Sequence, residues 1–176
     1  NIFAFASSRG FSVIRTGRRI EVLLCSEDEN INPDICFSIE KYTETIYDES
    51  NKTTKEKPMD RILICQNRSI FVFDIESTEK RKIEQWTFDL PKKDDNSNSQ
   101  TFHSIIRCFI IKHSFFLLLF KDGEAVIVKD KTGEIVCEIS DLPTNPNPSR
   151  IQLYENELIY FMKSDIVQKE IDFKLE

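Results

Sequence analysis

Glycine is scarce in this chain of 176 residues, where it occurs only 4 times and always as a single residue. The sequence therefore lacks a glycine-rich loop of the kind that cradles a phosphate. Long apolar runs are also missing. The longest, Phe115–Phe120, is strand-sized and far short of the roughly 20 residues that span a bilayer. We therefore expect neither a nucleotide-binding loop nor a membrane partner.

Groups suited to catalysis are few and scattered. His103 and His113 are the only imidazoles, and neither has a Cys or His partner at the close spacing that zinc sites use. Cys108 and His113 come nearest to a nucleophile pair, but no neighbour offers an oxyanion hole or an orienting carboxylate. A core thiol beside a turn histidine is the better interpretation. We expect no catalytic residue, no metal, no cofactor and no small-molecule substrate.

The charge balance limits the class of partner, and the cysteines indicate the cellular compartment. With 30 acidic and 24 basic residues the net charge is −6, which argues against a broad cationic face for duplex nucleic acid. The 5 cysteines are an odd number and widely spaced, which favours reduced, buried thiols in the nucleus or cytoplasm over a disulfide framework. Because the chain begins inside an apolar run and without Met, we expect it to be a fragment of a longer protein or the ordered part of one.

Short runs of alternating apolar and polar residues, bounded by polar turns, are abundant. The 14 Phe residues and the many Val, Ile and Thr favour strands, and no window gives a clean helical stripe. Asp122-Gly123 and Thr132-Gly133 can supply the positive φ that tight hairpins need. The fold class is therefore all-β and antiparallel. The predicted strands are 2–7, 11–15, 20–25, 61–66, 69–75, 82–90, 104–112, 115–120, 124–130, 134–140, 150–153, 157–162 and 166–173.

Several segments interrupt this rhythm. Residues 37–47 have an ambiguous pattern, which we interpret as a strand entering a loop. Residues 48–60 and 92–101 are too polar to bury, and we interpret both as exposed, mobile insertions. The proline-rich connection at 142–149 is predicted to be stiff.

Similar strands recur along the chain. They begin at Ile62, Phe115 and Leu158, which are 53 and then 43 residues apart. Propeller blades repeat at about 40–45 residues, and the insertion at 92–101 accounts for the longer first interval. Residues 108–139 form four predicted strands in one meander, which is the plan of a blade. We therefore predict that residues 1–176 are part of one β-propeller, with about three to four blades or part-blades.

The residues 120–136, Phe-Lys-Asp-Gly-Glu-Ala-Val-Ile-Val-Lys-Asp-Lys-Thr-Gly-Glu-Ile-Val, resemble a hairpin of the WD-repeat β-propeller family. Residues 68–74 resemble the same third strand one blade earlier. Phe73-Asp74 and Lys129-Asp130 stand where that family has its Trp-Asp pair. An open set of blades leaves sheet faces and edges bare, so this resemblance implies further blades.

Within that family, the chain resembles the non-catalytic propeller subunit of the tRNA (guanine-N7)-methyltransferase. That subunit also carries a polar insertion, which 48–60 matches, and a turn that Asp130-Lys131-Thr132-Gly133 matches. The resemblance implies a chain that binds no methyl donor and stabilises a catalytic methyltransferase subunit. The resemblance assigns none of that subunit's partner-contacting residues to positions in this chain.

One cationic cluster is present, formed by Arg15, Arg18 and Arg19 around a predicted turn. Arginine guanidinium groups suit phosphate, so these three could contact an RNA backbone or a partner protein. A solvated turn is the favoured interpretation. From the sequence we expect a non-catalytic propeller scaffold or regulatory subunit that binds a protein partner, with an RNA-contacting module as the alternative.

Overall fold

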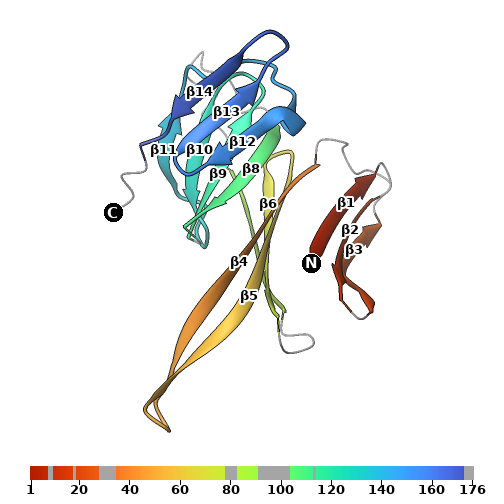
Figure 1. The fold of residues 1–176 in the computed structure, drawn as a ribbon, viewed down its shortest axis with the longest axis vertical. Helices are drawn as coiled ribbons and strands as arrows, with labels where there is room; N and C mark the ends of the chain where they lie inside the picture. Colours follow the sequence, from red (N-terminus) through yellow and green to blue (C-terminus); the bar gives the residue numbers. More distant parts are fainter. Residues whose placement is uncertain are drawn as a thin grey trace.

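The protein is described here from a computed structural model, which covers residues 1–7, 10–17, 19–27, 35–77, 83–90, 104–112 and 114–172. Its described part is all-β and forms four small antiparallel sheets (Figure 1). Among the same residues, no helix has the length and the apolar character needed to cross a membrane. The predicted insertion at 92–101 lies outside the described residues.

Each sheet is a meander in which strands adjacent in the chain are hydrogen-bonded neighbours. The first sheet contains β1 (Ile2–Ser7), β2 (Gly10–Thr16) and β3 (Ile20–Glu27). The second contains β4 (Ile35–Asp48), β5 (Thr53–Gln66), β6 (Ser69–Glu76) and β7 (Ile83–Asp89). The third contains β8 (Ile105–Ile111), β9 (Phe115–Phe120), β10 (Ala125–Lys129) and β11 (Ile135–Ile139). A short 3-10 helix, η1 (Pro148–Arg150), precedes the fourth sheet of β12 (Ile151–Tyr154), β13 (Glu157–Phe161) and β14 (Ile166–Glu170).

The sheets pack face to face, so the second and third sheets are buried on both sides. In β5, Ile62 and Ile64 pack toward the first sheet, whereas Leu63 and Cys65 pack toward the third. In β9, Leu117 and Leu119 in the same way pack against the fourth sheet. Successive side chains of a strand point to opposite faces, so a strand covered on both faces must be apolar at every position. This explains the unbroken apolar runs in β5 and β9.

The structure agrees with the predicted repeat. Ile62, Phe115 and Leu158 lie in β5, β9 and β13, and each of these is the second strand of its sheet in chain order. The fold class, all-β and antiparallel, is confirmed. The described residues form an open stack of sheets and no closed propeller.

One part of the secondary-structure prediction is wrong. Residues 37–47 do not end in a loop and residues 48–60 are not an unstructured insertion, because β4 and β5 pair along their full length from Ile35↔Gln66 to Asp48↔Thr53. The far half of this hairpin is exposed, as the polarity predicted. Alternate residue pairs there can exchange backbone hydrogen bonds while the polar side chains stay in water, so polarity alone did not reveal the strands.

The turn glycines act as predicted at two positions. Gly123 has φ +87° and Gly133 has φ +68°, in the left-handed region that glycine tolerates best. A Cβ at Gly133 would also lie only 2.4 Å from the ring of Phe88 in β7. The hairpin between β10 and β11 is thereby fitted closely against the second sheet.

Candidate functional site

A buried arginine connects the second sheet to the third. Arg61 in β5 donates from Nε and Nη2 to the two carboxylate oxygens of Asp74 in β6, both at 2.7 Å. Its Nη1 donates to Asp130, just after β10, at 2.8 Å. Arg61 and Asp74 are 5% and 4% exposed, so these are charge-assisted bonds inside the protein, about twice as strong as neutral ones.

Aromatic side chains surround the Arg61 guanidinium. Its central carbon lies 5.1 Å from the ring centroid of Tyr42 and 5.3 Å from that of Trp86, within cation–π range. Tyr42 donates its hydroxyl hydrogen to Asp74 at 3.1 Å. Trp86 in β7 donates from Nε1 to the backbone carbonyl of Asp130 at 2.6 Å. We call Arg61, Asp74, Asp130, Tyr42 and Trp86 the arginine cluster.

The cluster shifts the ionisation of its members. Burial, together with the charge of Asp74, raises the pKa of Tyr42 to about 12, and the nearby charge of Arg61 only partly opposes this. Burial alone would lower the pKa of Arg61, but hydrogen bonds and charge from Asp74 outweigh burial and raise it. The arginine cluster is thus a stable ion pair that contains no activated nucleophile, and its geometry suits a link between sheets better than a reaction.

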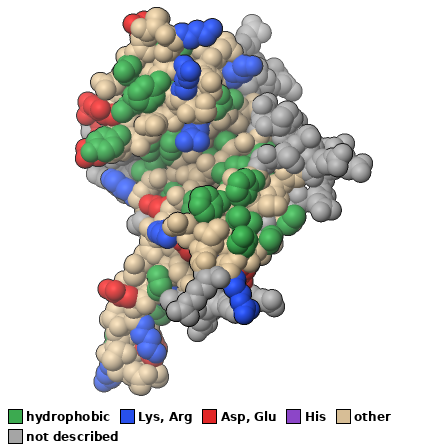
Figure 2. Space-filling model, turned by 45° about the vertical axis from the view of Figure 1, so that its right-hand side comes forward, with side chains coloured by type: hydrophobic (Ala, Val, Ile, Leu, Met, Phe, Trp, Pro, Cys, Tyr) green, Lys and Arg blue, Asp and Glu red, His purple; other side chains and the backbone are tan. Residues whose placement is uncertain are grey.

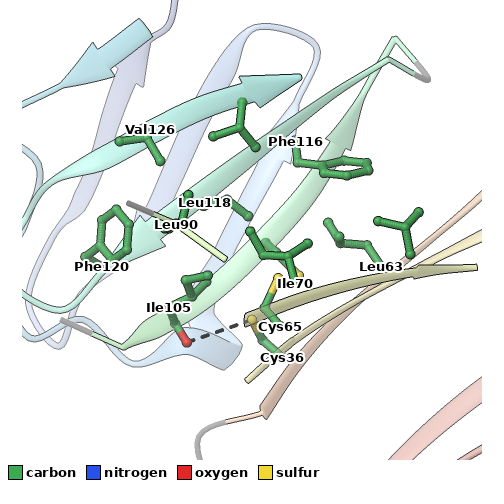
Figure 3. Close-up of a cluster of buried hydrophobic side chains, with 13 residues drawn as sticks. Cys36, Leu63, Cys65, Ile70, Leu90, Ile105, Phe116, Leu118, Phe120 and Val126 are labelled. Atoms are coloured by element: carbon green, nitrogen blue, oxygen red, sulfur yellow. Dashed lines mark hydrogen bonds between the residues drawn. The ribbon is translucent and has the colours of Figure 1, made fainter. Parts of the chain in front are cut away.

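A second cluster consists of three cysteine side chains. Cys36 in β4, Cys65 in β5 and Cys108 in β8 are all buried, and their sulfur atoms lie within 4.8 Å of one another. Cys36 and Cys65 are direct cross-strand partners. Figure 3 shows both side chains beside Ile105, whose carbonyl oxygen accepts a hydrogen bond from the Cys36 thiol at 4.0 Å. We call these three residues the sulfur cluster.

The apolar setting and the contacts among the three thiols shift their pKa values in different directions. Burial raises the pKa of Cys65 and of Cys108 well above the ordinary value, because a thiolate is poorly solvated there. Cys36 differs, because hydrogen bonds from Cys108 and Cys65 lower the pKa of Cys36 well below the ordinary value. The positive charge of Arg107 also favours thiolates at Cys36 and Cys108.

The far half of the β4–β5 hairpin is largely exposed. Among the residues that the structure describes, β6 pairs with β5 from Met59 to Gln66, and Ser77 donates one further backbone hydrogen bond to Pro58 at 2.9 Å. From Glu44↔Lys57 to Asp48↔Thr53 the two strands have only each other as described backbone partners. We call residues 43–58 the ribbon. Figure 1 shows it projecting away from the four sheets. Near its tip Ile46 is 43% exposed and Tyr47 is 60% exposed.

Ion pairs and turn hydrogen bonds hold the ribbon in shape. Asp48 accepts hydrogen bonds from Ser50 and Asn51 and pairs with Lys55 at 3.2 Å. These bonds lower the pKa of Asp48 to about 2. At its base, Lys57 contacts Glu76 of β6 at 3.0 Å. Figure 2 shows the ribbon as a narrow extension that carries side chains of both charges.

The structure describes two of the three predicted arginines, Arg15 and Arg19. Arg15 lies 3.6 Å from the carboxylate of Asp60 and donates to the backbone carbonyl of Glu76 at 3.4 Å. Its guanidinium is thereby directed to the second sheet. Arg19 is exposed, and Arg18 lies outside the described residues. The described arginines of this turn do not both point into solvent as a phosphate site would require.

Sequence reasoning missed both buried clusters. His103 and His113 lie outside the described residues, so the structure does not place Cys108 relative to either. The prediction of buried thiols is confirmed for Cys36, Cys65 and Cys108, but it is wrong for Cys25, which is exposed, and holds only in part for Cys137, which is half-buried. The meeting of the three buried thiols could not be predicted, because they come from three strands of two sheets. The arginine cluster did leave a signal, since Asp74 and Asp130 are the two residues that stand at the Trp-Asp position.

Comparison with protein-family models and with curated proteins gives no match for this chain.

Proposed function

We propose that this chain is part of a non-catalytic, propeller-type scaffold and that the ribbon is where it binds a protein partner. The observation that carries this proposal is the ribbon itself. A two-stranded hairpin without a third strand is only marginally stable in water, yet this one extends well beyond its sheet and exposes Ile46 and Tyr47 at its end. Tyrosine is among the residues that most often anchor protein interfaces.

The stack of sheets supports the propeller part of the proposal. Successive meanders packed face to face are what consecutive blades form. The two outer faces carry exposed apolar side chains, which are Phe3, Phe5, Ile20 and Val22 on the first sheet and Tyr154, Phe161 and Ile166 on the fourth. Neighbouring blades would cover such faces. The arginine cluster then acts as a fixed link between two blades.

The resemblance noted in the sequence suggests which partner to test first, the catalytic subunit of a tRNA (guanine-N7)-methyltransferase. In that role the chain would supply no methyl donor and no reacting group. It would hold its partner in a stable, active form.

The test is affinity purification from the source cell with three versions of the protein. Tyr47→Ser removes the aromatic ring at the ribbon tip. Tyr154→Ser is the matched control, since Tyr154 is equally exposed, at 66%, but lies on the fourth sheet. We expect one stoichiometric partner with the wild type and with Tyr154→Ser, and about 10-fold less or lower recovery with Tyr47→Ser, as for an interface anchor. Equal recovery with all three, or no stoichiometric partner, would contradict the proposal.

A further inference from the structure

The sulfur cluster has the donor set of a metal site. Cys36, Cys65 and Cys108 each offer one sulfur atom, and these atoms lie within 4.8 Å of one another. A metal–sulfur bond is about 2.3 Å long, so a trigonal ion holds its three sulfurs about 4 Å apart. Movements of less than about 1 Å would therefore bring all three sulfurs onto one ion. Side-chain rotation can supply such movements without a change of fold.

The number and type of donors decide which ion fits. Within the described part of the chain, no histidine, carboxylate or fourth cysteine joins the group. Structural zinc is almost always bound by four ligands, whereas thiolate sulfur selects soft ions, of which Cu⁺ is one. Three sulfurs without a fourth donor therefore favour a soft, three-coordinate ion over Zn²⁺.

The surroundings exclude water as the missing fourth ligand. Cys65 and Cys108 are 0% and 1% exposed, and the cluster lies in an apolar core with Leu63, Ile70 and Ile105 (Figure 3). A shell of aliphatic side chains also protects a Cu⁺ thiolate from solvent and oxidation.

One positive charge of β8 favours an anionic centre at the sulfur cluster. Three thiolates around a monovalent ion carry net negative charge, which is costly in an apolar core. The charge of Arg107 in β8 acts on both Cys36 and Cys108. Its Nε atom is buried and has no hydrogen-bond partner among the residues that the structure describes. The Arg107 guanidinium lies over the Phe109 ring, 5.0 Å from its centroid, and thus on the face of β8 opposite to Cys108, so its charge reaches the thiolates across the strand.

We propose that Cys36, Cys65 and Cys108 bind one Cu⁺ ion through three thiolates and that this ion ties the second sheet to the third. Binding forms three Cu–S bonds, and every proton that the three sulfurs still carry is released to solvent. Copper stays Cu⁺ and no sulfur is oxidised, so no other reactant is needed. This site goes beyond the proposed partner binding, which does not depend on it.

The test is an anaerobic titration with Cu⁺, held in competition with the chromophoric chelator bicinchoninate. It uses protein in which the two cysteines outside the cluster are changed, Cys25→Ser and Cys137→Ser. We expect one Cu⁺ per chain, and three sulfur neighbours in X-ray absorption. Adding Cys65→Val keeps the core apolar but removes one sulfur, and should weaken binding by at least about 100-fold.

If Cys65→Val does not fold, the sulfur count in the parent protein decides the matter alone. Fewer than three sulfur neighbours would overturn the proposal, as would binding that Cys65→Val leaves unchanged. A Zn²⁺ ion that displaces Cu⁺ at equal concentration would also overturn it, since that result requires a fourth ligand.

Discussion

The Arg61 guanidinium contacts one carboxylate of its own sheet and another of the next sheet. Neither contact could be predicted, because Asp74 and Asp130 both have the sequence pattern of ordinary strand-end aspartates. What the sequence did indicate was that they occupy equivalent places in two repeats. The structure adds that one arginine from β5 reaches both, and only the packing of the sheets could reveal that.

The arginine cluster predicts a large effect of a single substitution. Asp74→Ala leaves the buried Arg61 without its bidentate partner, so the free energy of unfolding should fall by about 3–5 kcal/mol. Asp165→Ala, at an exposed carboxylate, should change it by less than about 0.5 kcal/mol. Urea unfolding at neutral pH measures both values. If Asp74→Ala lowered the free energy of unfolding by less than about 1 kcal/mol, the ion pair would not be buried as described.

The raised pKa of Tyr42 predicts that alkaline pH lowers the stability of the fold. Its pKa is raised to about 12 in the folded protein from about 10 when unfolded. Tyr42 therefore adds stability that is fully present below pH 10 and is lost as pH rises through about 12, because only the unfolded state ionises in that window. An ultraviolet phenolate titration of wild type minus Tyr42→Phe should show a midpoint near pH 12. A midpoint near pH 10 would contradict the buried setting.

The conformation and packing of Gly133 predict that a side chain at this turn destabilises the fold. Gly133→Ala places a Cβ at positive φ and against the Phe88 ring, and should destabilise the fold by about 1–3 kcal/mol. Gly17→Ala is the matched control, since a Cβ there meets nothing within 4 Å. Thermal unfolding of both variants gives the comparison. If both had the same midpoint as the wild type, the β10–β11 hairpin would not fit against Phe88 as described.

At the scale of elements, the ribbon shows where sequence reasoning failed. Apolar alternation predicted the strands with buried sides, and each of those predictions corresponds to an observed strand. The ribbon has no buried side, so its sequence lacks the alternation and resembles a loop. Its strands are held by backbone pairing and by contacts such as Asp48 with Lys55, which leave little trace in hydropathy.

The ribbon also predicts that it can be shortened. Replacing residues 45–56 by Asn-Gly joins Glu44 to Lys57 through a two-residue turn that suits a hairpin. The removed side chains are mostly exposed, so the free energy of unfolding in urea should change by less than about 1 kcal/mol. Partner binding should be lost. Lost stability with retained binding would show that the ribbon serves the fold and not the partner.

At the scale of the whole molecule, the order of the sheets followed from the sequence and their association did not. The strand pattern predicted about three to four blades or part-blades in chain order, and the turn glycines Gly123 and Gly133 marked the hairpins of one of them. The repeat placed Ile62, Phe115 and Leu158 in equivalent strands. Which faces meet depends on side chains far apart in the chain, such as Cys36 and Cys108, and no local pattern encodes that.

The central claim is that this chain binds a protein partner through the ribbon and not through the exposed faces of its outer sheets. Photo-crosslinking in the source cell tests it most directly, with a benzophenone amino acid placed at Tyr47 in one protein and at Tyr154 in another. We expect a discrete crosslinked product of one partner from position 47 and none from position 154. A product from position 154 alone, or from neither position, would contradict it.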